Sequence, residues 1–180
     1  MYSIKPPIPP RTLPVFCPLF YKEQCDEYRK DLQLYSRPIT DGCNYDHYEI
    51  PSNVHENIKL YAKASHCISK LNDEAFKYDI DYIKLHYCGL DDRGIFPPTT
   101  PYLNRDNRQI KLAFMINLND DYEGGMSYVG IRDEQRAVVS GVDVGTLIAF
   151  PSFFTININP PLGSGRKEFI LGYSYGPDFK

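Results

Sequence analysis

The side chains best suited to chemistry in this chain are four histidines, and all of them lie in its first half. They are His47, His55, His66 and His86. Imidazole nitrogens are common ligands of transition metals, and a non-haem iron site of the usual kind needs two of them beside one carboxylate. Because no histidine follows residue 86, any imidazole site must be built from the first half of the chain alone.

One short segment has the spacing of a pair of metal ligands. His86 and Cys88 are two positions apart in a run that alternates like a β-strand, so we expect them on one face. A third ligand could come from His47, Asp91 or Asp92. Two residues constrain a metal site only loosely, and a strand whose His and Cys simply pack is the simpler interpretation.

Other common catalytic patterns are absent from the sequence. There is no Gly-x-Ser-x-Gly nucleophile elbow, and Gly163-Ser164-Gly165 lacks the lysine of a phosphate-binding loop. The acidic residues around position 45 do not follow the order of a calcium loop. The sequence therefore indicates neither a nucleophile elbow, nor a phosphate-binding loop, nor a calcium site.

Composition limits the class of protein. The 180 residues carry a net charge of −3 with no dense Lys/Arg run, so we expect no nucleic-acid partner. No apolar stretch is long enough to span a membrane, and the N-terminus lacks the apolar core of a secretion signal. Five widely spaced cysteines favour free thiols in a reducing compartment. We expect a protein that is cytoplasmic or associated with a particle such as a virion.

The first sixteen residues differ from the rest. Their prolines exclude a helix and favour an extended arm, and they stand at positions 6, 7, 9, 10 and 14. Such an arm cannot bury itself, so we expect either its own domain or a neighbouring chain to hold it. Fifteen tyrosines and no tryptophan also suit a protein-contact surface, although tyrosines at the edges of the core would explain the count equally well. We divide the chain into an arm over 1–16 and one domain over 17–180.

Two helices are expected at the start of that domain. Apolar and charged residues alternate with helical spacing over about 18–36 and again over about 53–75. Asn53, with Glu56 three residues later, resembles a capping box at the start of the second helix.

The remainder, about 78–176, reads as a β-core. Its short strands are separated by turn signals at regular intervals, which is typical of a sandwich or barrel. Within this core we expect strands over 78–88, 109–118, 126–130, 135–140, 146–150, 154–159 and 168–175, and one further strand over 40–50, between the two helices. The predicted fold is mainly β (α+β), with the two helices covering one outer face.

Four segments then resemble a known family in their order and spacing. They are Asp81-Tyr-Ile-Lys-Leu-His-Tyr-Cys-Gly89, Gln109 to Asn119, Asp121-Tyr-Glu-Gly-Gly125, and Val144-Gly-Thr-Leu-Ile-Ala-Phe-Pro-Ser152 running on to Pro177. Together they resemble the prolyl-4-hydroxylase-like branch of the 2-oxoglutarate/iron(II) oxygenases, in its phage and bacterial form. The resemblance implies a double-stranded β-helix, or jelly roll, with N-terminal helices packed on one sheet.

The resemblance also implies where the family's functional residues should fall. The His-x-Asp ligands map near Ile95 and Pro97, and the distal histidine maps to Ile156, so none of the three positions carries a ligand. The basic residue that binds the far carboxylate of 2-oxoglutarate maps to Arg166, and Tyr87 matches an aromatic that helps hold this cosubstrate. Arg166 could equally be paired with an internal carboxylate.

From these positions we expect a catalytically inactive oxygenase-like protein without a cofactor. It would serve as a structural or interaction subunit of a larger assembly, such as a phage or virus particle, and contact other subunits through its arm and a tyrosine-rich surface. Two alternatives remain open. One is an active dioxygenase that uses Fe(II) and 2-oxoglutarate at a non-standard metal site, and the other is an anion- or peptide-binding module that uses Arg166.

Overall fold

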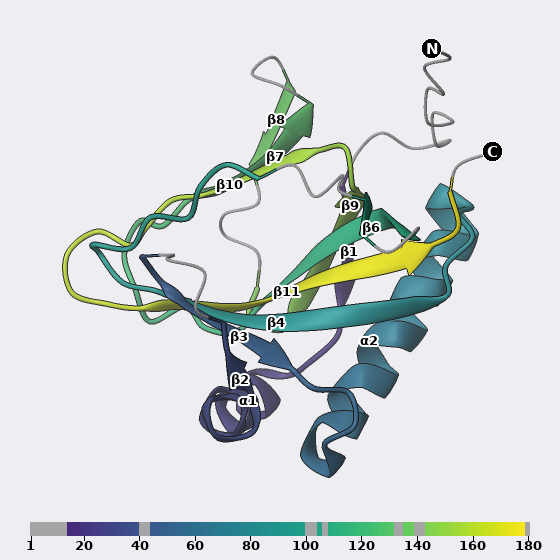
Figure 1. Cartoon of the computed structure of the whole chain (residues 1–180). Helices are drawn as coiled ribbons and strands as arrows, with labels where there is room; N and C mark the ends of the chain where they lie inside the picture. The colour runs from purple at the N-terminus through teal and green to yellow at the C-terminus, as the bar shows by residue number, and fades with distance from the viewer. Residues whose placement is uncertain are drawn as a thin grey trace.

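The computed structural model describes residues 14–39, 44–99, 104–105, 108–131, 135–138 and 143–178. Its strands form two antiparallel sheets that face each other, with helices on the outer side of the larger one (Figure 1). Residues 1–13 of the arm expected over 1–16 lie outside the described residues. Within the described part, no helix is long and apolar enough to cross a membrane.

The larger sheet has the strand order β1-β9-β6-β11-β4-β3-β2, with β5 paired to β6, and the smaller sheet has the order β10-β7-β8. The strands of the larger sheet are β1 Val15–Pro18, β2 Arg37–Pro38, β3 Asp46–Ile50, β4 Tyr82–Leu90, β5 Asn104–Arg105, β6 Arg108–Asn117, β9 Thr146–Pro151 and β11 Lys167–Gly176. Those of the smaller sheet are β7 Ser127–Ile131, β8 Gln135–Val138 and β10 Thr155–Ile158.

Two helices precede the long strands of the sheet. Helix α1 spans Lys22–Tyr35, and α2 spans Ile58–Leu71 between a 3-10 turn, η1 His55–Asn57, and a π-helical turn, η2 Asn72–Phe76. The π turn ends at Lys77, which adopts a left-handed conformation and donates its backbone N–H to the Asn72 carbonyl. The helices thus lie close to where the sequence pattern places them.

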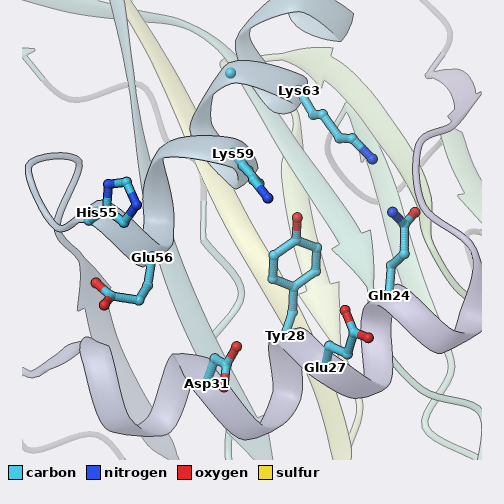
Figure 2. A pocket seen from close by; sticks show the side chains of 9 residues that line it. Gln24, Glu27, Tyr28, Asp31, His55, Glu56, Lys59 and Lys63 are labelled. Carbon is cyan, nitrogen blue, oxygen red and sulfur yellow. The ribbon is translucent and has the colours of Figure 1, made fainter.

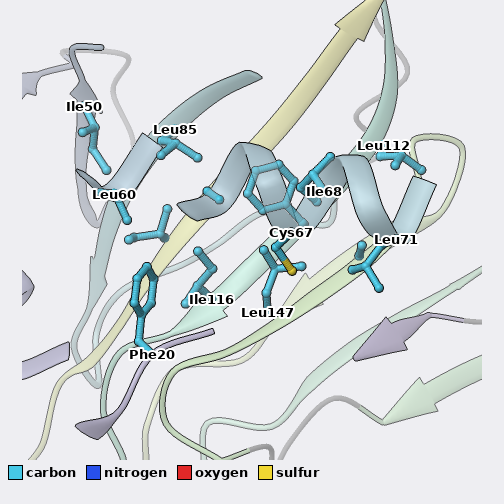
Figure 3. Packing of buried hydrophobic residues seen from close by; sticks show 14 of the residues in the cluster. Phe20, Ile50, Leu60, Cys67, Ile68, Leu71, Leu85, Leu112, Ile116 and Leu147 are labelled. Atoms are coloured by element: carbon cyan, nitrogen blue, oxygen red, sulfur yellow. The ribbon is translucent and has the colours of Figure 1, made fainter. Parts of the chain in front are cut away.

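The buried residues form two clusters, one on each side of the larger sheet. The outer cluster joins the helices to the sheet, and Figure 3 shows Leu60, Ile68 and Leu71 of α2 packed against Leu85 and Ile116 of the strands. The inner cluster lies between the two sheets and contains Cys88, Ile148, Ile156, Phe169 and Leu171. Residues that alternate along β4 and β11 therefore belong alternately to the two clusters, as strand geometry requires.

The predicted fold class is confirmed. The structure is mainly antiparallel β with two helices on one face of the larger sheet, and the eight strands expected from residue 40 onward are all present. Two local expectations differ. Val15 and Phe16, at the end of the expected arm, pair with β9 as part of β1. The capping box at Asn53 is wrong, because the helical turn begins after Val54 without a side-chain cap.

Candidate functional site

The family resemblance places an iron site on the inner side of the jelly roll, between the two sheets. The backbone of Ile156 on β10 is bridged to that of Thr99, which follows the loop after β4. The N–H of Thr99 donates to the carbonyl of Ile156 at 3.0 Å, and the N–H of Ile156 donates back at 2.8 Å. The segment that follows β4 and the strand that carries Ile156 are thus fixed side by side.

The side chains that this arrangement turns inward are hydrocarbon. Ile156 has no exposed surface, and Phe96 is 5% exposed. The Phe96 ring lies between Tyr45, at 5.1 Å between ring centres, and Phe169, at 5.9 Å. Phe154 belongs to the same inner cluster. Aromatic contacts at these distances are favourable and leave little space between the rings.

The other two residues that map to ligand positions lie elsewhere. Ile95 is 65% exposed and Pro97 is also exposed, so neither side chain shares the buried surface of Ile156. Sequence reasoning missed Phe96, the residue between them that points inward. The strand-like alternation of buried and exposed side chains over 94–97 is the signal that identifies it.

The residues around Ile156 do not fit an iron(II) ion. Iron of this type needs imidazole and carboxylate ligands, and the inner wall offers isoleucine and phenylalanine. Across the described ranges, no three or more His, Cys, Asp or Glu side chains are grouped so that they could hold a metal ion. We therefore derive no oxygen chemistry from this site.

Arg166 and Tyr87 do meet, but on the helix-covered side of the sheet. The Arg166 guanidinium is hydrogen-bonded to Asp46 and lies 3.9 Å from Glu168, while the Tyr87 hydroxyl donates to Glu168. Gly89 has no side chain to obstruct the guanidinium, which lies directly over it. Because two carboxylates already offset its charge, Arg166 would have to exchange one of them to bind another anion.

The same network attaches helix α1 to the sheet. Arg29 of α1 forms an ion pair with Glu168 at 2.5 Å, and Gln33 of α1 donates to the Tyr87 hydroxyl at 3.1 Å. Burial, together with the bond to Glu168, raises the pKa of Tyr87 to about 12. The Tyr87 hydroxyl therefore stays protonated and acts as a hydrogen-bond donor at neutral pH.

Lys167 is a cation that sequence reasoning missed. It begins β11, two residues before the inward-facing Phe169, so strand alternation directs it between the sheets. It is 3% exposed, and its ammonium donates to the Gly125 carbonyl and the Ser127 hydroxyl of the smaller sheet. Burial lowers its pKa to about 8. Lys167 is therefore a basic residue that points between the sheets, whereas the neighbouring Arg166 faces the helix-covered side.

Of the residues considered for a non-standard metal site, the structure brings one pair together. Nε2 of His47 on β3 lies 3.1 Å from Nδ1 of His86 on β4. Asp91 and Asp92 are exposed in the turn after β4, while Cys88 is fully buried in the inner cluster.

A groove lies away from the barrel interior, between the two helices. Its volume is about 540 Å³, and Figure 2 shows Glu27 and Asp31 of α1 across from Lys59 and Lys63 of α2. Tyr28 is also among its lining residues, and Glu56 adds a negative charge on the side of the two lysines. The groove is therefore lined mainly by charged and polar side chains.

Comparison with solved structures gives the fold a context. A prolyl-4-hydroxylase of Pseudomonas putida aligns with a TM-score of 0.68 at 14% identity, over 89% of this chain and 91% of that one. The viral collagen prolyl hydroxylase of Paramecium Bursaria Chlorella virus-1 aligns with a TM-score of 0.64 at 14% identity, over 92% and 96%.

A third similar structure is a prolyl hydroxylase of Trichoplax adhaerens in complex with a hypoxia-inducible-factor peptide. Its TM-score is 0.69 at 13% identity, and the alignment covers 90% of this chain and 83% of that one. No family model matches this sequence, and no curated protein does. The chain thus has the jelly-roll fold of prolyl-4-hydroxylase-like 2-oxoglutarate/iron(II) oxygenases.

Proposed function

We propose that this protein is a catalytically silent relative of the 2-oxoglutarate/iron(II) oxygenases that serves as a structural or interaction subunit of a larger assembly. The observation that carries the proposal is the inner wall of the barrel. Ile156 stands at one position where the resemblance expects an iron ligand, and Phe96 stands between the other two; both are buried, and Phe96 contacts the rings of Tyr45 and Phe169. An iron-dependent oxygenase has to bind its metal and 2-oxoglutarate at one centre, and hydrocarbon supplies neither contact.

The surfaces available for assembly support the second half of the proposal. The proline-rich arm over 1–13 precedes β1, which ties the chain to the edge of the larger sheet. Among the tyrosines of the described ranges, Tyr21, Tyr35 and Tyr82 are the exposed ones; Tyr21 precedes α1, and Tyr35 is its last residue. The charged groove between α1 and α2 lies on the same helical layer. A phage or virus particle is our proposed setting, in line with the sequence resemblance to phage-type members.

Removal of the arm tests the assembly role. We expect the tagged full-length chain to elute from size-exclusion chromatography of its source lysate well above monomer mass. A chain lacking residues 1–13 should shift toward the monomer while keeping its circular dichroism spectrum. If both chains elute together, the arm is not the contact. If both elute as monomers, the assembly role is wrong.

A second candidate function is the binding of a small carboxylate inside the barrel, and Lys167 favours it. A buried ammonium that donates to two neutral oxygens has no neutralising carboxylate among those two partners. Its proposed ligand is a dicarboxylate such as 2-oxoglutarate, held without metal. Calorimetric titration with 2-oxoglutarate should show heat of binding with the wild type and with Arg166→Met, and none with Lys167→Met. Heat that persists in Lys167→Met, or is absent from the wild type, removes this candidate.

A further inference from the structure

We propose that His47 and His86 form a two-imidazole binding site for a late first-row divalent metal ion such as Ni²⁺, Cu²⁺ or Zn²⁺. The two histidines lie on the adjacent strands β3 and β4 and point to the same side of the sheet. They are not the positions that match the iron ligands of the oxygenases, and the proposed function assigns them no role.

The distance between the two nitrogens suits a shared metal. Nε2 of His47 and Nδ1 of His86 are 3.1 Å apart. With metal–nitrogen bonds of about 2.0–2.1 Å, this separation corresponds to an angle of about 95–102° at the metal. Such an angle lies between the square-planar and tetrahedral values, which suits Cu²⁺, Ni²⁺ and Zn²⁺. The pair can therefore bind a metal without a change in the strands.

The strand register explains why the rings meet. His47 pairs with Cys88, and His86 pairs with Glu49, so the two imidazoles are diagonal neighbours on one face of an antiparallel ladder. Diagonal side chains on one face are within reach of each other when they are long or aromatic. The backbone ladder thus fixes the positions from which both rings extend.

Aromatic neighbours hold each imidazole in place. Tyr45 stacks on His47 with ring centres 5.6 Å apart, and Tyr173 meets His86 edge to face at 5.7 Å. Both histidines are half-buried, so a metal could reach them from solvent and complete its coordination with water. Side chains that are already oriented lose less entropy when they bind.

Metal binding requires that both facing imidazole nitrogens carry no proton. The contact between two neutral imidazoles uses one N–H donor and one lone pair. When both nitrogens bind a metal, the ring that donated moves its proton to its other nitrogen by exchange with water, so that each ring carries one proton, on Nδ1 of His47 and Nε2 of His86. The number of protons on the two rings is unchanged, and no further reactant is needed.

Calorimetry with Ni²⁺ tests the site on the full-length chain. We expect a single Ni²⁺ to bind the wild type. The variants His47→Gln and His86→Gln should each bind it at least about ten-fold more weakly, because even the loss of a residue that orients a ligand costs that much. His66→Gln is the matched control, since His66 is exposed on α2, and it should behave as the wild type. Cys88→Ser should also leave the affinity unchanged.

A second measurement keeps the test valid if a variant fails to fold. The electron paramagnetic resonance spectrum of the wild type with less than one equivalent of Cu²⁺ should show coupling to two nitrogens. Equal Ni²⁺ affinity in the wild type and both histidine variants would overturn the proposal. Loss of affinity in His66→Gln, or a copper spectrum without two-nitrogen coupling, would overturn it as well.

Discussion

Thr99 and Ile156 exchange a pair of backbone hydrogen bonds that connect the segment after β4 to β10. This bridge brings together the two parts of the chain that should carry the iron ligands of an oxygenase. What they contribute at the meeting point is Ile156 and Phe96, both buried. Both side chains belong to the core between the two sheets.

If Ile156 is a core residue, its truncation should lower the free energy of unfolding. Ile156→Ala should cost about 3 kcal/mol, because it leaves a cavity between the sheets. Ile95→Ala is the matched control, since the same atoms are removed from a side chain that is 65% exposed, and it should cost under about 0.5 kcal/mol. Urea unfolding followed by circular dichroism measures both. Equal costs would contradict this account of the inner wall.

The attachment of α1 to the sheet should depend on one buried carboxylate. Arg29→Ala leaves Glu168, whose side chain is 5% exposed, without its closest cation, and should cost about 3 kcal/mol. Lys22→Ala removes an ion pair with Asp120 in which both side chains are 59% exposed, and should leave the unfolding midpoint unchanged. Adding Glu168→Gln to Arg29→Ala should recover part of the loss. If Arg29→Ala and Lys22→Ala are equally stable, the network around Glu168 does not attach α1 to the sheet.

Lys167 should make stability depend on pH in a characteristic direction. Burial lowers its pKa to about 8 from the ordinary 10.5, so between these values the unfolded chain holds a proton that the folded chain lacks. Stability therefore rises with pH across this window, as the penalty for a buried charge disappears.

Lys167→Met has no such penalty, so its unfolding free energy should lack this rise. Between pH 7.5 and 9.5, the wild type should gain about 2 kcal/mol relative to the variant. Parallel denaturant titrations across the range measure the difference, and contributions from other groups cancel. A difference that stays constant would show that Lys167 remains charged in the folded protein.

Much of this fold could be predicted because its strands carry a strong pattern. The alternation along 80–88 predicts that Tyr87 and Cys88 lie on opposite faces of a strand, and they belong to the outer and the inner cluster respectively. Strand β1 was not predicted, because it follows a run of prolines and its sequence is typical of an extended arm. Its pairing with β9 depends on long-range contacts that local propensity does not encode.

The site was harder to predict, because a shift of one position reverses the face of a strand. Arg166 and Lys167 are adjacent, and only the position of Phe169 in the inner cluster shows which of them points inward. Ile95 and Phe96 are also adjacent, and the sequence alone does not show which of them points inward. The contact between His47 and His86 depends on the register of β3 against β4, which the sequence alone does not determine.

The central claim concerns oxygenase chemistry, and succinate release from 2-oxoglutarate tests it most directly. The purified chain would be loaded with Fe(II) without oxygen, supplied with 2-oxoglutarate and then exposed to air, with the Pseudomonas putida prolyl-4-hydroxylase run beside it. We predict succinate at the level of the protein-free reaction, in the presence and absence of proline-containing peptides. Repeated, enzyme-dependent turnover of 2-oxoglutarate to succinate would contradict the account.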